Sequence, residues 1–380
     1  MSTAKAFVDE LYKRFDKDDV NANILYVGGR TGMSGDKGGK SVEQRVIGDA
    51  TDIPFVTISS GKLQRRLDGT LLKMPFGVTA GFFQSLRILR EFKPDVVFST
   101  GGFVTVPVAM AAWVLRIPIY LHEQTAAIGL ANKIVSRFAK KIFITFESSK
   151  SEFPEGKVVH TGHLLRKAIF QKESDTPLAR ELKAALNGNN MRVVTLIGGG
   201  QGSHKLNMAF KDALPKLLEK YILVLQLGNN SQFDDFATLN EIKQSLPDKL
   251  RSRLILTKFI TEDEIGFILD KTDIFVGRAG AALVYEMAVL RKPSIFVPIP
   301  WVTHNEQEKN AQNLVDAGLA RILPEANLSG DALSAEIEQL ASDLDSGRVK
   351  INDELLTNRF PTNGPAVVVD EVTVFLSECT

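Results

Sequence analysis

The run of glycines at residues 198–203 is the feature of this sequence whose chemistry is most readily inferred. Three consecutive glycines, then Gln, Gly and Ser, stand directly after an apolar run that predicts a strand and directly before a helical pattern. Glycines let the backbone approach a phosphate closely, and a helix N-terminus supplies free N–H groups and a positive dipole. A plain strand-to-helix turn needs fewer glycines, so the pattern favours phosphate binding. The residues predicted to bind it are Gly199, Gly200, Gln201 and Gly202.

A second set of small residues, at 277–281, opens another predicted helix. Gly280 and Ala281 leave its N-terminus accessible to an anion, with Arg278 close by. Glu286 falls within this helix, where a carboxylate can accept hydrogen bonds from both hydroxyls of a ribose. The alternative is a solvated glutamate on the helix surface, because that is the usual place of a lone Glu.

Gln307 and Asn310 follow a stiff turn that contains Pro298 and Pro300. The prolines end the preceding strand, since proline fixes φ and cannot donate to a sheet. Gln307 and Asn310 stand three residues apart and so share one face of the next helix. They could bind a ligand together; amides on a helix surface are the alternative.

His122 and Glu123 come directly after another predicted strand, and Gly101 and Gly102 come after the strand before it. In a sheet of parallel strands both segments end at the same edge. His122 could act as a base or as a hydrogen-bond donor, and a structural histidine at a strand end is the alternative. The five histidines are dispersed and lack ligand spacing, so the sequence predicts no metal site.

The elements that position these motifs alternate between short β-branched strands and longer helical patterns. This alternation predicts an α/β fold with parallel sheets and helices on both faces. The predicted strands are residues 24–27, 96–99, 117–121, 141–146, 193–197, 222–226, 254–257, 274–276 and 294–297. A polar stretch at residues 171–190 interrupts this alternation of strands and helices, which then begins again. The interruption indicates two Rossmann-like domains. We place them at residues 1–168 and 169–363.

Composition narrows the range of partners and compartments. Lys and Arg number 46 and Asp and Glu 45, so no net charge draws the chain to nucleic acid. The sequence has a single cysteine, and it shows no signal peptide and no apolar run of transmembrane length. These features predict a cytoplasmic protein. Basic residues from Lys62 to Lys73 lie among apolar residues up to Phe83, which suits an anionic membrane face. A core helix with solvated lysines is the equal alternative.

Taken in chain order, these motifs resemble the MurG family, and the match spans nearly the whole chain. The segments that carry it are residues 94–97, 101–103, 122–124, 129–133, 198–202, 278–281 and 307–311. The resemblance implies the GT-B architecture, in which two Rossmann-like domains face a cleft and a C-terminal helix, here 364–378, returns to the first domain. It also implies an inverting transferase that moves N-acetylglucosamine from UDP-N-acetylglucosamine (UDP-GlcNAc) to undecaprenyl-diphospho-N-acetylmuramoyl-pentapeptide (lipid I). The product, lipid II, serves peptidoglycan synthesis, and thereby cell shape and division, at the cytoplasmic face of the cell membrane.

The resemblance also assigns roles residue by residue. Ile260 would hold the uracil, Glu286 the ribose, and Arg166 and Gln307 would be further donor contacts. Gly200 stands where the family often has a phosphate-binding serine. Two helix N-termini would stabilise the diphosphate leaving group, with no cofactor and no obligatory metal. The predicted catalytic residues are His122 and Glu123; the predicted substrate-binding residues are Thr125, Arg166, Gly199, Gly200, Gln201, Gly202, Ile260, Arg278, Gly280, Ala281, Glu286, Gln307 and Asn310.

The sequence departs from the family at its beginning. The family opens with a strand and a Gly-Gly-Thr-Gly-Gly-His loop, whereas residues 3–15 predict the helix that follows that loop. Because the first strand of a doubly wound sheet is central, we expect a gap or a strained pairing between the strands at 24–27 and 96–99. We also expect the first domain to be the less stable one, and sugar transfer to require an upstream segment.

Two other functions remain open on the sequence. Only the departure at the beginning favours a catalytically silent UDP-sugar-binding protein. Separately, Thr125 stands where the family usually has asparagine. A related glycolipid glycosyltransferase, or a nucleotide-sugar epimerase of the same fold, is the second alternative. The segment 122–124, with Gln307 and Asn310, favours the lipid I transferase over that second alternative.

Overall fold

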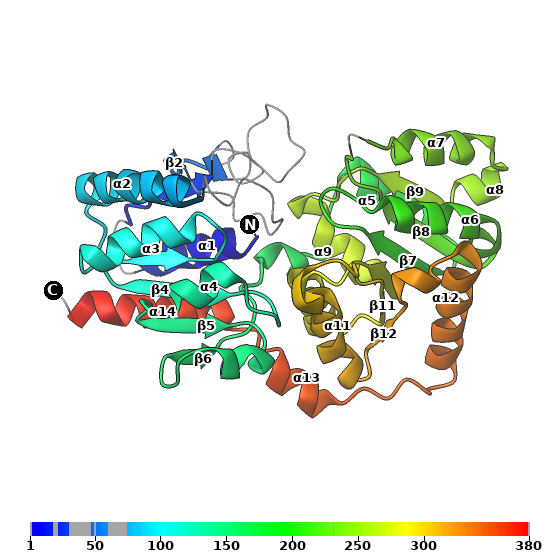
Figure 1. Ribbon diagram of the computed structural model, residues 1–380. Helices are drawn as coiled ribbons and strands as arrows, with labels where there is room; N and C mark the ends of the chain where they lie inside the picture. The colour runs from blue at the N-terminus through cyan, green and yellow to red at the C-terminus, as the bar shows by residue number, and fades with distance from the viewer. Residues whose placement is uncertain are drawn as a thin grey trace. The chain divides into compact units, whose positions relative to one another are not determined.

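The computed structural model describes residues 2–17, 22–29, 47–48, 51–59, 74–230 and 232–378 (Figure 1). The chain divides into two compact units. Unit 1 is Met1–Arg166 together with Pro361–Thr380, and unit 2 is Lys167–Phe360. Among the residues so described, no helix has both the length and the apolar character needed to cross a membrane.

The described strands of unit 1 form two separate parallel sheets. One holds β1 (Tyr26–Gly29) and β2 (Phe55–Ile58), with Tyr26 opposite Phe55. The other has the order β3-β4-β5-β6. Its strands are β3 (Val97–Ser99), β4 (Ile119–Glu123), β5 (Lys141–Ile144) and β6 (Val158–His160). β1 and β3 thus belong to different sheets, and this is the gap that the sequence predicts.

Helices pack on both faces of the four-stranded sheet because its side chains alternate in direction. Ile119 and Leu121 of β4 pack on one side against α2, α3 and α4, whereas Tyr120 packs on the other side against α1 and α14. α1 and α14 lie side by side in Figure 1. The helices of unit 1 are α1 (Ser2–Lys17), α2 (Met74–Phe92), α3 (Thr105–Val114), α4 (Leu130–Val135), the 3₁₀ turn Glu147–Glu152 and α14 (Gly364–Glu378).

Aromatic side chains join the two sheets of unit 1 through α1. Phe7 of α1 stacks on Phe98 of β3, with 3.8 Å between ring centroids. Tyr26 and Phe55 of the two-stranded sheet stack on each other at 5.2 Å and pack into the same apolar cluster. Side-chain packing therefore holds β1 and β3 in one unit although no described strand pairs with both.

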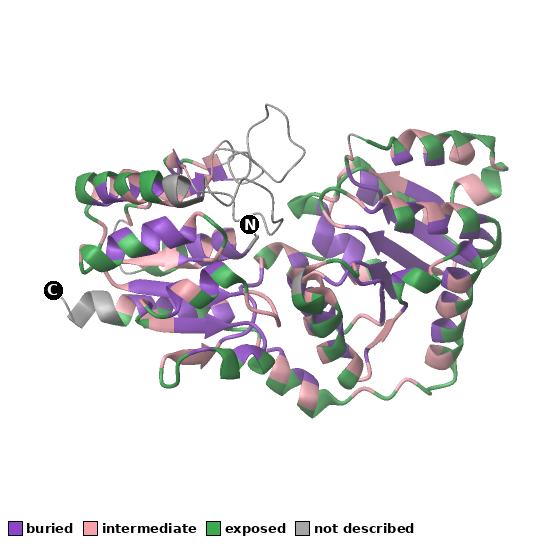
Figure 2. Ribbon diagram, viewed as in Figure 1, coloured by how far each residue is buried: buried purple, intermediate pink, exposed green. Residues whose placement is uncertain are grey.

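Unit 2 is built on one continuous parallel sheet with the order β12-β11-β10-β7-β8-β9. The sheet is buried on both faces, as Figure 2 shows in purple. Its strands are β7 (Arg192–Ile197), β8 (Tyr221–Gln226), β9 (Leu254–Thr257), β10 (Ile274–Gly277), β11 (Ser294–Phe296) and β12 (Ala320–Ile322). β12 is half-buried and β9 is half-buried at its end, whereas the other strands are buried along almost their whole length. Buried strands read as unbroken apolar runs, so most of these strands can be recognised in the sequence.

The helices of unit 2 cover the two faces of this sheet. α6 and α12 pack with one apolar cluster, and α5 and α9 pack with the other. The α-helices are α5 (Pro177–Leu186), α6 (His204–Lys220), α7 (Asp235–Ser245), α8 (Asp248–Arg251), α9 (Glu262–Lys271), α10 (Ala281–Val289), α11 (Glu306–Asp316), α12 (Gly330–Asp345) and α13 (Asp353–Arg359). Three 3₁₀ turns are Lys167–Phe170, Thr303–Asn305 and Glu325–Asn327.

Candidate active site

The glycine-rich loop of unit 2 runs from the end of β7 to the start of α6. Gly199 and Gly202 have positive φ values of 89° and 75°, which favour glycine. A Cβ at residue 202 would lie 1.9 Å from the carbonyl oxygen of Leu227, whereas one at Gly199 or Gly200 would meet nothing within 4 Å. The loop is thus packed tightly on one side and open at the two glycines where the sequence predicts a phosphate.

A second helix, α10, begins beside α6. α10 follows β10, and α6 follows β7. Because β7 and β10 are neighbouring parallel strands, both helix N-termini lie at the same edge of the sheet. Gly280 caps α10 and has no side chain to bond its N–H groups. Two uncapped helix N-termini beyond adjacent strand ends form a positive site for an anion.

Arg278 links the loops in front of the two helices. Its guanidinium donates to Ser203 Oγ from Nε (3.0 Å) and from Nη2 (2.7 Å), and Nη1 donates to the carbonyl oxygen of Val297 (2.9 Å). Glu325 pairs with Arg278 at 2.6 Å and with Lys205 at 2.7 Å. Burial acts to raise the pKa of Glu325, but the two cations outweigh it, and the pKa lies below its ordinary value.

Asn310 and Gln307 each hold one of the surrounding loops. Asn310 is fully buried, and its Nδ2 donates to the carbonyl oxygen of Ala279 at 3.1 Å. Gln307 is half-buried, and its Oε1 accepts from the N–H of Ile299 at 3.0 Å. The alternative of two surface amides is therefore wrong for Asn310. The residues just before this helix, His304 and Asn305, have positive φ values of 54° and 52°, so the chain enters α11 through a strained turn.

The remaining residues that the sequence assigned to the donor are distributed around these loops. Glu286 lies within α10 and is 2% exposed, so the alternative of a solvated glutamate is wrong. Ala281 is buried at the start of the same helix. Ile260 is half-buried just before α9, and Gln201 is exposed in the glycine-rich loop. Arg166 is half-buried and is the last residue of the first segment of unit 1, Met1–Arg166.

Four residues of this region were not predicted from the sequence: Ser203, Lys205, Gln226 and Glu325. Gln226, at the end of β8, donates to the carbonyl oxygen of Gly199 at 3.0 Å and so fixes the open part of the loop. Ser203 stands at the position where serine often caps a helix, which is a local signal. Glu325 has no such signal, because its partners lie far away in the sequence.

In unit 1, His122 and Glu123 are both buried at the end of β4. His122 Nε2 donates to the carbonyl oxygen of Gly162 at 3.1 Å, and its Nδ1 has no partner among the described residues. Burial lowers the pKa of His122 to about 4. The ring is therefore neutral at physiological pH.

Glu123 organises the segment that follows β4. Its Oε1 accepts from the N–H and the hydroxyl of Thr125 at 3.0 and 2.9 Å, and its Oε2 accepts from Asn132 Nδ2 at 2.8 Å. Burial raises the pKa of Glu123, and these hydrogen bonds lower it in part. Gly101, with φ 92°, passes so close to Asn132 that a Cβ would meet its side chain at 2.9 Å. Unit 1 thus places both motifs, Gly101 and residues 122–125, together, as the sequence predicts.

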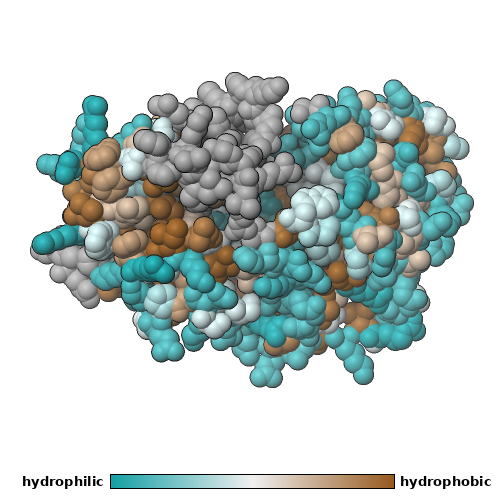
Figure 3. Space-filling view, viewed as in Figure 1, coloured by the Kyte–Doolittle hydropathy of each residue, from teal (hydrophilic) through white to brown (hydrophobic). Residues whose placement is uncertain are grey.

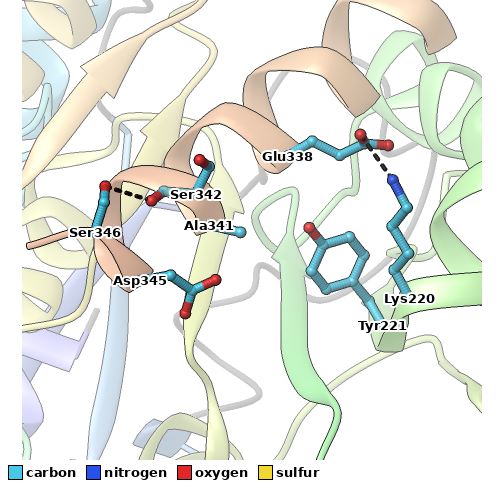
Figure 4. Close-up of a pocket in the computed structure, with 7 residues that line it drawn as sticks. All are labelled: Lys220, Tyr221, Glu338, Ala341, Ser342, Asp345 and Ser346. Atoms are coloured by element: carbon cyan, nitrogen blue, oxygen red, sulfur yellow. Dashed lines mark hydrogen bonds and ion pairs between the residues drawn. The ribbon is translucent and has the colours of Figure 1, made fainter. Parts of the chain in front are cut away.

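A surface pocket of about 420 Å³ lies elsewhere on unit 2 (Figure 4). Tyr221 and Lys220 stand where α6 meets the start of β8, so the pocket is at the opposite edge of the sheet from the glycine-rich loop. It is lined by Lys220, Tyr221, Glu338, Ala341, Ser342, Asp345 and Ser346. It is not part of the site described above. No group of three or more candidate metal ligands occurs in the described parts of the chain.

Two family models match the chain. The glycosyltransferase family 28 N-terminal domain matches residues 39–144, and the glycosyltransferase family 28 C-terminal domain matches residues 193–354. The first lies within unit 1 and the second within unit 2. The fold and the site thus define a two-domain glycosyltransferase of the α/β class, which confirms the expected fold class.

Curated relatives narrow the family further. The chain is 34% identical over 329 residues to the UDP-N-acetylglucosamine–N-acetylmuramyl-(pentapeptide) pyrophosphoryl-undecaprenol N-acetylglucosamine transferase 2 of Bacillus anthracis, which covers 86% of this chain and 85% of the relative. The corresponding transferase of Geobacillus thermodenitrificans is 33% identical over 333 residues, 87% of this chain and 86% of the relative. The chain therefore belongs to the MurG family.

Solved structures show the same fold. The crystal structure of Acinetobacter baumannii MurG has a TM-score of 0.66 at 22% identity and covers 98% of this chain and 96% of that one. A UDP-GlcNAc 2-epimerase from Neisseria meningitidis, bound to UDP-GlcNAc, has a TM-score of 0.64 at 14% identity, with coverage of 98% and 96%. Fold alone does not separate the two activities, whereas the sequence relatives favour the transferase.

Proposed function

We propose that this chain transfers N-acetylglucosamine from UDP-GlcNAc to lipid I, forming lipid II for peptidoglycan synthesis. The observation that carries the proposal is the pair of uncapped helix N-termini, of α6 and α10, beyond adjacent strands of unit 2. Negative charge develops on the diphosphate as its bond to the sugar breaks. Fixed N–H groups stabilise that charge without reorganising at the moment of reaction.

The uridine would lie on unit 2 beside this diphosphate site. Glu286, on α10, is the proposed ribose contact, and Ile260 the proposed uracil contact. Gln307 and Asn310 bond the loops on either side, so part of their role is to position those loops. Arg278 is likewise bonded to protein atoms through Nε, Nη1 and Nη2, and we assign it a role in positioning.

On unit 1 we assign His122 and Glu123 a positioning role in place of direct proton transfer. Both are buried, and His122 donates to Gly162 while Glu123 accepts from Thr125 and Asn132. A base must come within hydrogen-bond reach of the proton it removes. Thr125 is half-buried at the end of this network and is the proposed contact for the acceptor.

We further propose that unit 1 docks on an anionic membrane surface. Exposed apolar side chains occur on α2 and α3, which pack together: Phe83 is 67% exposed and Trp113 59%. Figure 3 shows apolar surface over this part of the molecule. Exposed arginines, Arg87, Arg90 and Arg116, stand on or beside the same helices. The basic stretch from Lys62 to Lys73 lies outside the described residues, whereas Phe82 packs on the core of unit 1.

Vesicle sedimentation tests the docking surface. Trp113→Ala should lower binding to phosphatidylglycerol vesicles several-fold, because the indole is removed from the membrane interface. Trp301→Ala is the matched control, since Trp301 is similarly exposed but belongs to unit 2. Equal binding by both variants, or equal binding to neutral and anionic vesicles, would contradict this surface.

A transfer assay tests the function itself. Radiolabel from UDP-GlcNAc should enter lipid II when the protein is mixed with lipid I. Transfer by this chain without an added upstream segment would show that the expected requirement for such a segment is wrong. Gly202→Ala should abolish transfer because the added Cβ collides with the carbonyl oxygen of Leu227. UDP binding without transfer to lipid I would instead support a silent UDP-sugar-binding protein. Conversion of UDP-GlcNAc to UDP-N-acetylmannosamine, or to free N-acetylmannosamine and UDP where water also cleaves the sugar–phosphate bond, would indicate an epimerase.

A further inference from the structure

Ser203 stands at the N-cap of α6, yet its side chain does not cap the helix. A serine at this position ordinarily accepts a hydrogen bond from an N–H of the first turn. Here its φ and ψ of −135° and 98° are those of a normal cap, but Oγ accepts from Arg278 Nε and Nη2 instead. The Ser203 side chain therefore leaves the N–H groups of the first turn of α6 available to another acceptor.

The two bonds from Arg278 also fix what the Ser203 hydroxyl can do. A hydroxyl oxygen has two acceptor lone pairs and one proton to donate. Arg278 occupies both lone pairs, so the hydroxyl can act only as a donor. Ser203 is 7% exposed, and the structure shows no acceptor for this proton among the residues it describes.

The position of Arg278 is itself held from two further sides. Val297, just after β11, accepts from Nη1, and Glu325 pairs with Nη2. Glu325 also binds Lys205, in the first turn of α6, which brings a second cation to the helix N-terminus. The three charges sum to one positive charge at the mouth of an uncapped helix.

We propose that Ser203 is a phosphate-binding residue of the donor site, which donates its hydroxyl proton to a phosphate oxygen of UDP. Arg278 and Glu325 are positioning residues that turn the hydroxyl into a donor. This rests on the proposed donor site on unit 2 and adds to it a residue that the loop glycines do not supply. Gly199 and Gly200, in the same loop, have open space where a side chain would stand, and this space could receive the phosphate.

Two other roles for Ser203 make different predictions. If the hydroxyl only stabilised α6, its loss would lower the melting temperature and leave nucleotide binding unchanged. If Arg278 contacted the phosphate directly, a substitution of Glu325 would change the UDP affinity by the same factor whether residue 203 is serine or alanine. Calorimetric titration with UDP and with uridine separates these cases.

In the first experiment, Ser203→Ala is compared with Ser203→Thr. Ser203→Ala should weaken UDP binding about ten-fold or more, the effect of one hydrogen bond to a charged group. Uridine has no phosphate, so its affinity should stay the same. Ser203→Thr keeps a hydroxyl and should bind UDP within a few-fold of the unaltered protein. Unchanged UDP affinity in Ser203→Ala would overturn the proposal.

The second experiment tests the positioning role with Glu325→Gln. Removing a negative charge beside the site should by itself tighten UDP binding. If Glu325 acts through Ser203, Glu325→Gln should weaken UDP binding when serine is present, and should not weaken it when residue 203 is alanine. The same change in both backgrounds would overturn the positioning role. Failure of the unaltered protein to bind UDP would overturn the donor site itself.

Discussion

The six strands of unit 2 form one continuous parallel sheet, whereas the six described strands of unit 1 are divided into sheets of two and four. In unit 2 every strand between the two edges is paired on both sides. Among the described strands of unit 1, β1 and β3 each pair on one side only, and Phe7 of α1 stacks on Phe98 of β3. Backbone hydrogen bonds connect all six strands of unit 2. In unit 1 the two described sheets are connected by side-chain packing.

This difference bears on stability and on function. Backbone groups that lack ladder partners cost free energy when they are buried. Unit 1 is therefore expected to have the smaller free energy of unfolding, although both units have buried apolar clusters on each face of a sheet. The nucleotide site described above belongs to the unit with the continuous sheet, which suits the fixed positions that its loops require.

A matched pair of core substitutions should produce the largest effect. Phe143 and Phe275 are both fully buried on inner strands, of unit 1 and unit 2 respectively. Replacing a buried phenylalanine by alanine costs about 3–5 kcal/mol. We expect Phe143→Ala to unfold unit 1 at 37 °C, and Phe275→Ala to lower the melting temperature of unit 2 while leaving it folded.

The two tryptophans allow each unit to be followed separately. Trp113 lies in unit 1 and Trp301 in unit 2, and the chain has no others. Trp301→Phe leaves a fluorescence signal for unit 1, and Trp113→Phe leaves one for unit 2. If Phe275→Ala unfolds its unit while Phe143→Ala leaves its own folded, the comparison between the units is reversed.

The second-largest expected effect is a loss of stability of unit 1 at acidic pH. Burial lowers the pKa of His122 to about 4 and that of His163 to about 3, below the ordinary 6.5. Between pH 6.5 and 4 the unfolded chain binds these protons and the folded chain does not, so stability falls as pH falls through this window. His122 alone accounts for about 3 kcal/mol. Glu123 acts in the opposite direction, because burial raises its pKa.

Thermal melting of the two single-tryptophan proteins measures this difference. Between pH 7 and pH 4.5 the melting temperature of unit 1 should fall more than that of unit 2. Replacing His122 and His163 together by glutamine should flatten the dependence in unit 1. Equal slopes for the two units would show that these histidines do not set the acid response.

The smallest of these effects concerns a single ligand contact. Glu286→Ala should weaken UDP binding by about 1.5–3 kcal/mol, through lost hydrogen bonds between the ribose hydroxyls and a carboxylate. Asp331→Ala is a matched control, because Asp331 is an exposed carboxylate in the first turn of α12. Calorimetric titration with UDP measures both. Affinity unchanged in Glu286→Ala would remove this residue from the site.

The sequence predicts the fold better than it predicts the side-chain network. Long apolar runs such as β7 and β8 are recognised with small errors at their ends. β2, β6 and β12 were not predicted, because they have three or four residues, are at most half-buried for the most part and carry little periodicity. Their existence depends on the neighbouring strand that each one pairs with.

The candidate site, like the short strands, could be predicted only in part from the sequence. The glycines of the loop form a local pattern that can be recognised in the sequence, and two of them, Gly199 and Gly202, have backbone conformations that favour glycine. The bonds among Ser203, Arg278 and Glu325 join segments far apart in the sequence, so no local pattern announces them. Burial of His122 and Glu123 also depends on packing against other segments, and the sequence therefore left a catalytic and a structural role equally open for His122.

Amide hydrogen exchange with and without UDP tests most directly whether the nucleotide site is built on unit 2. Binding stabilises the segments that contact the ligand and slows their exchange. We predict the strongest UDP-dependent protection at residues 198–207 and 278–286, the N-terminal parts of α6 and α10, with β1 and β3 of unit 1 exchanging at nearly unchanged rates. Protection confined to unit 1, or none at either helix N-terminus, would contradict the account.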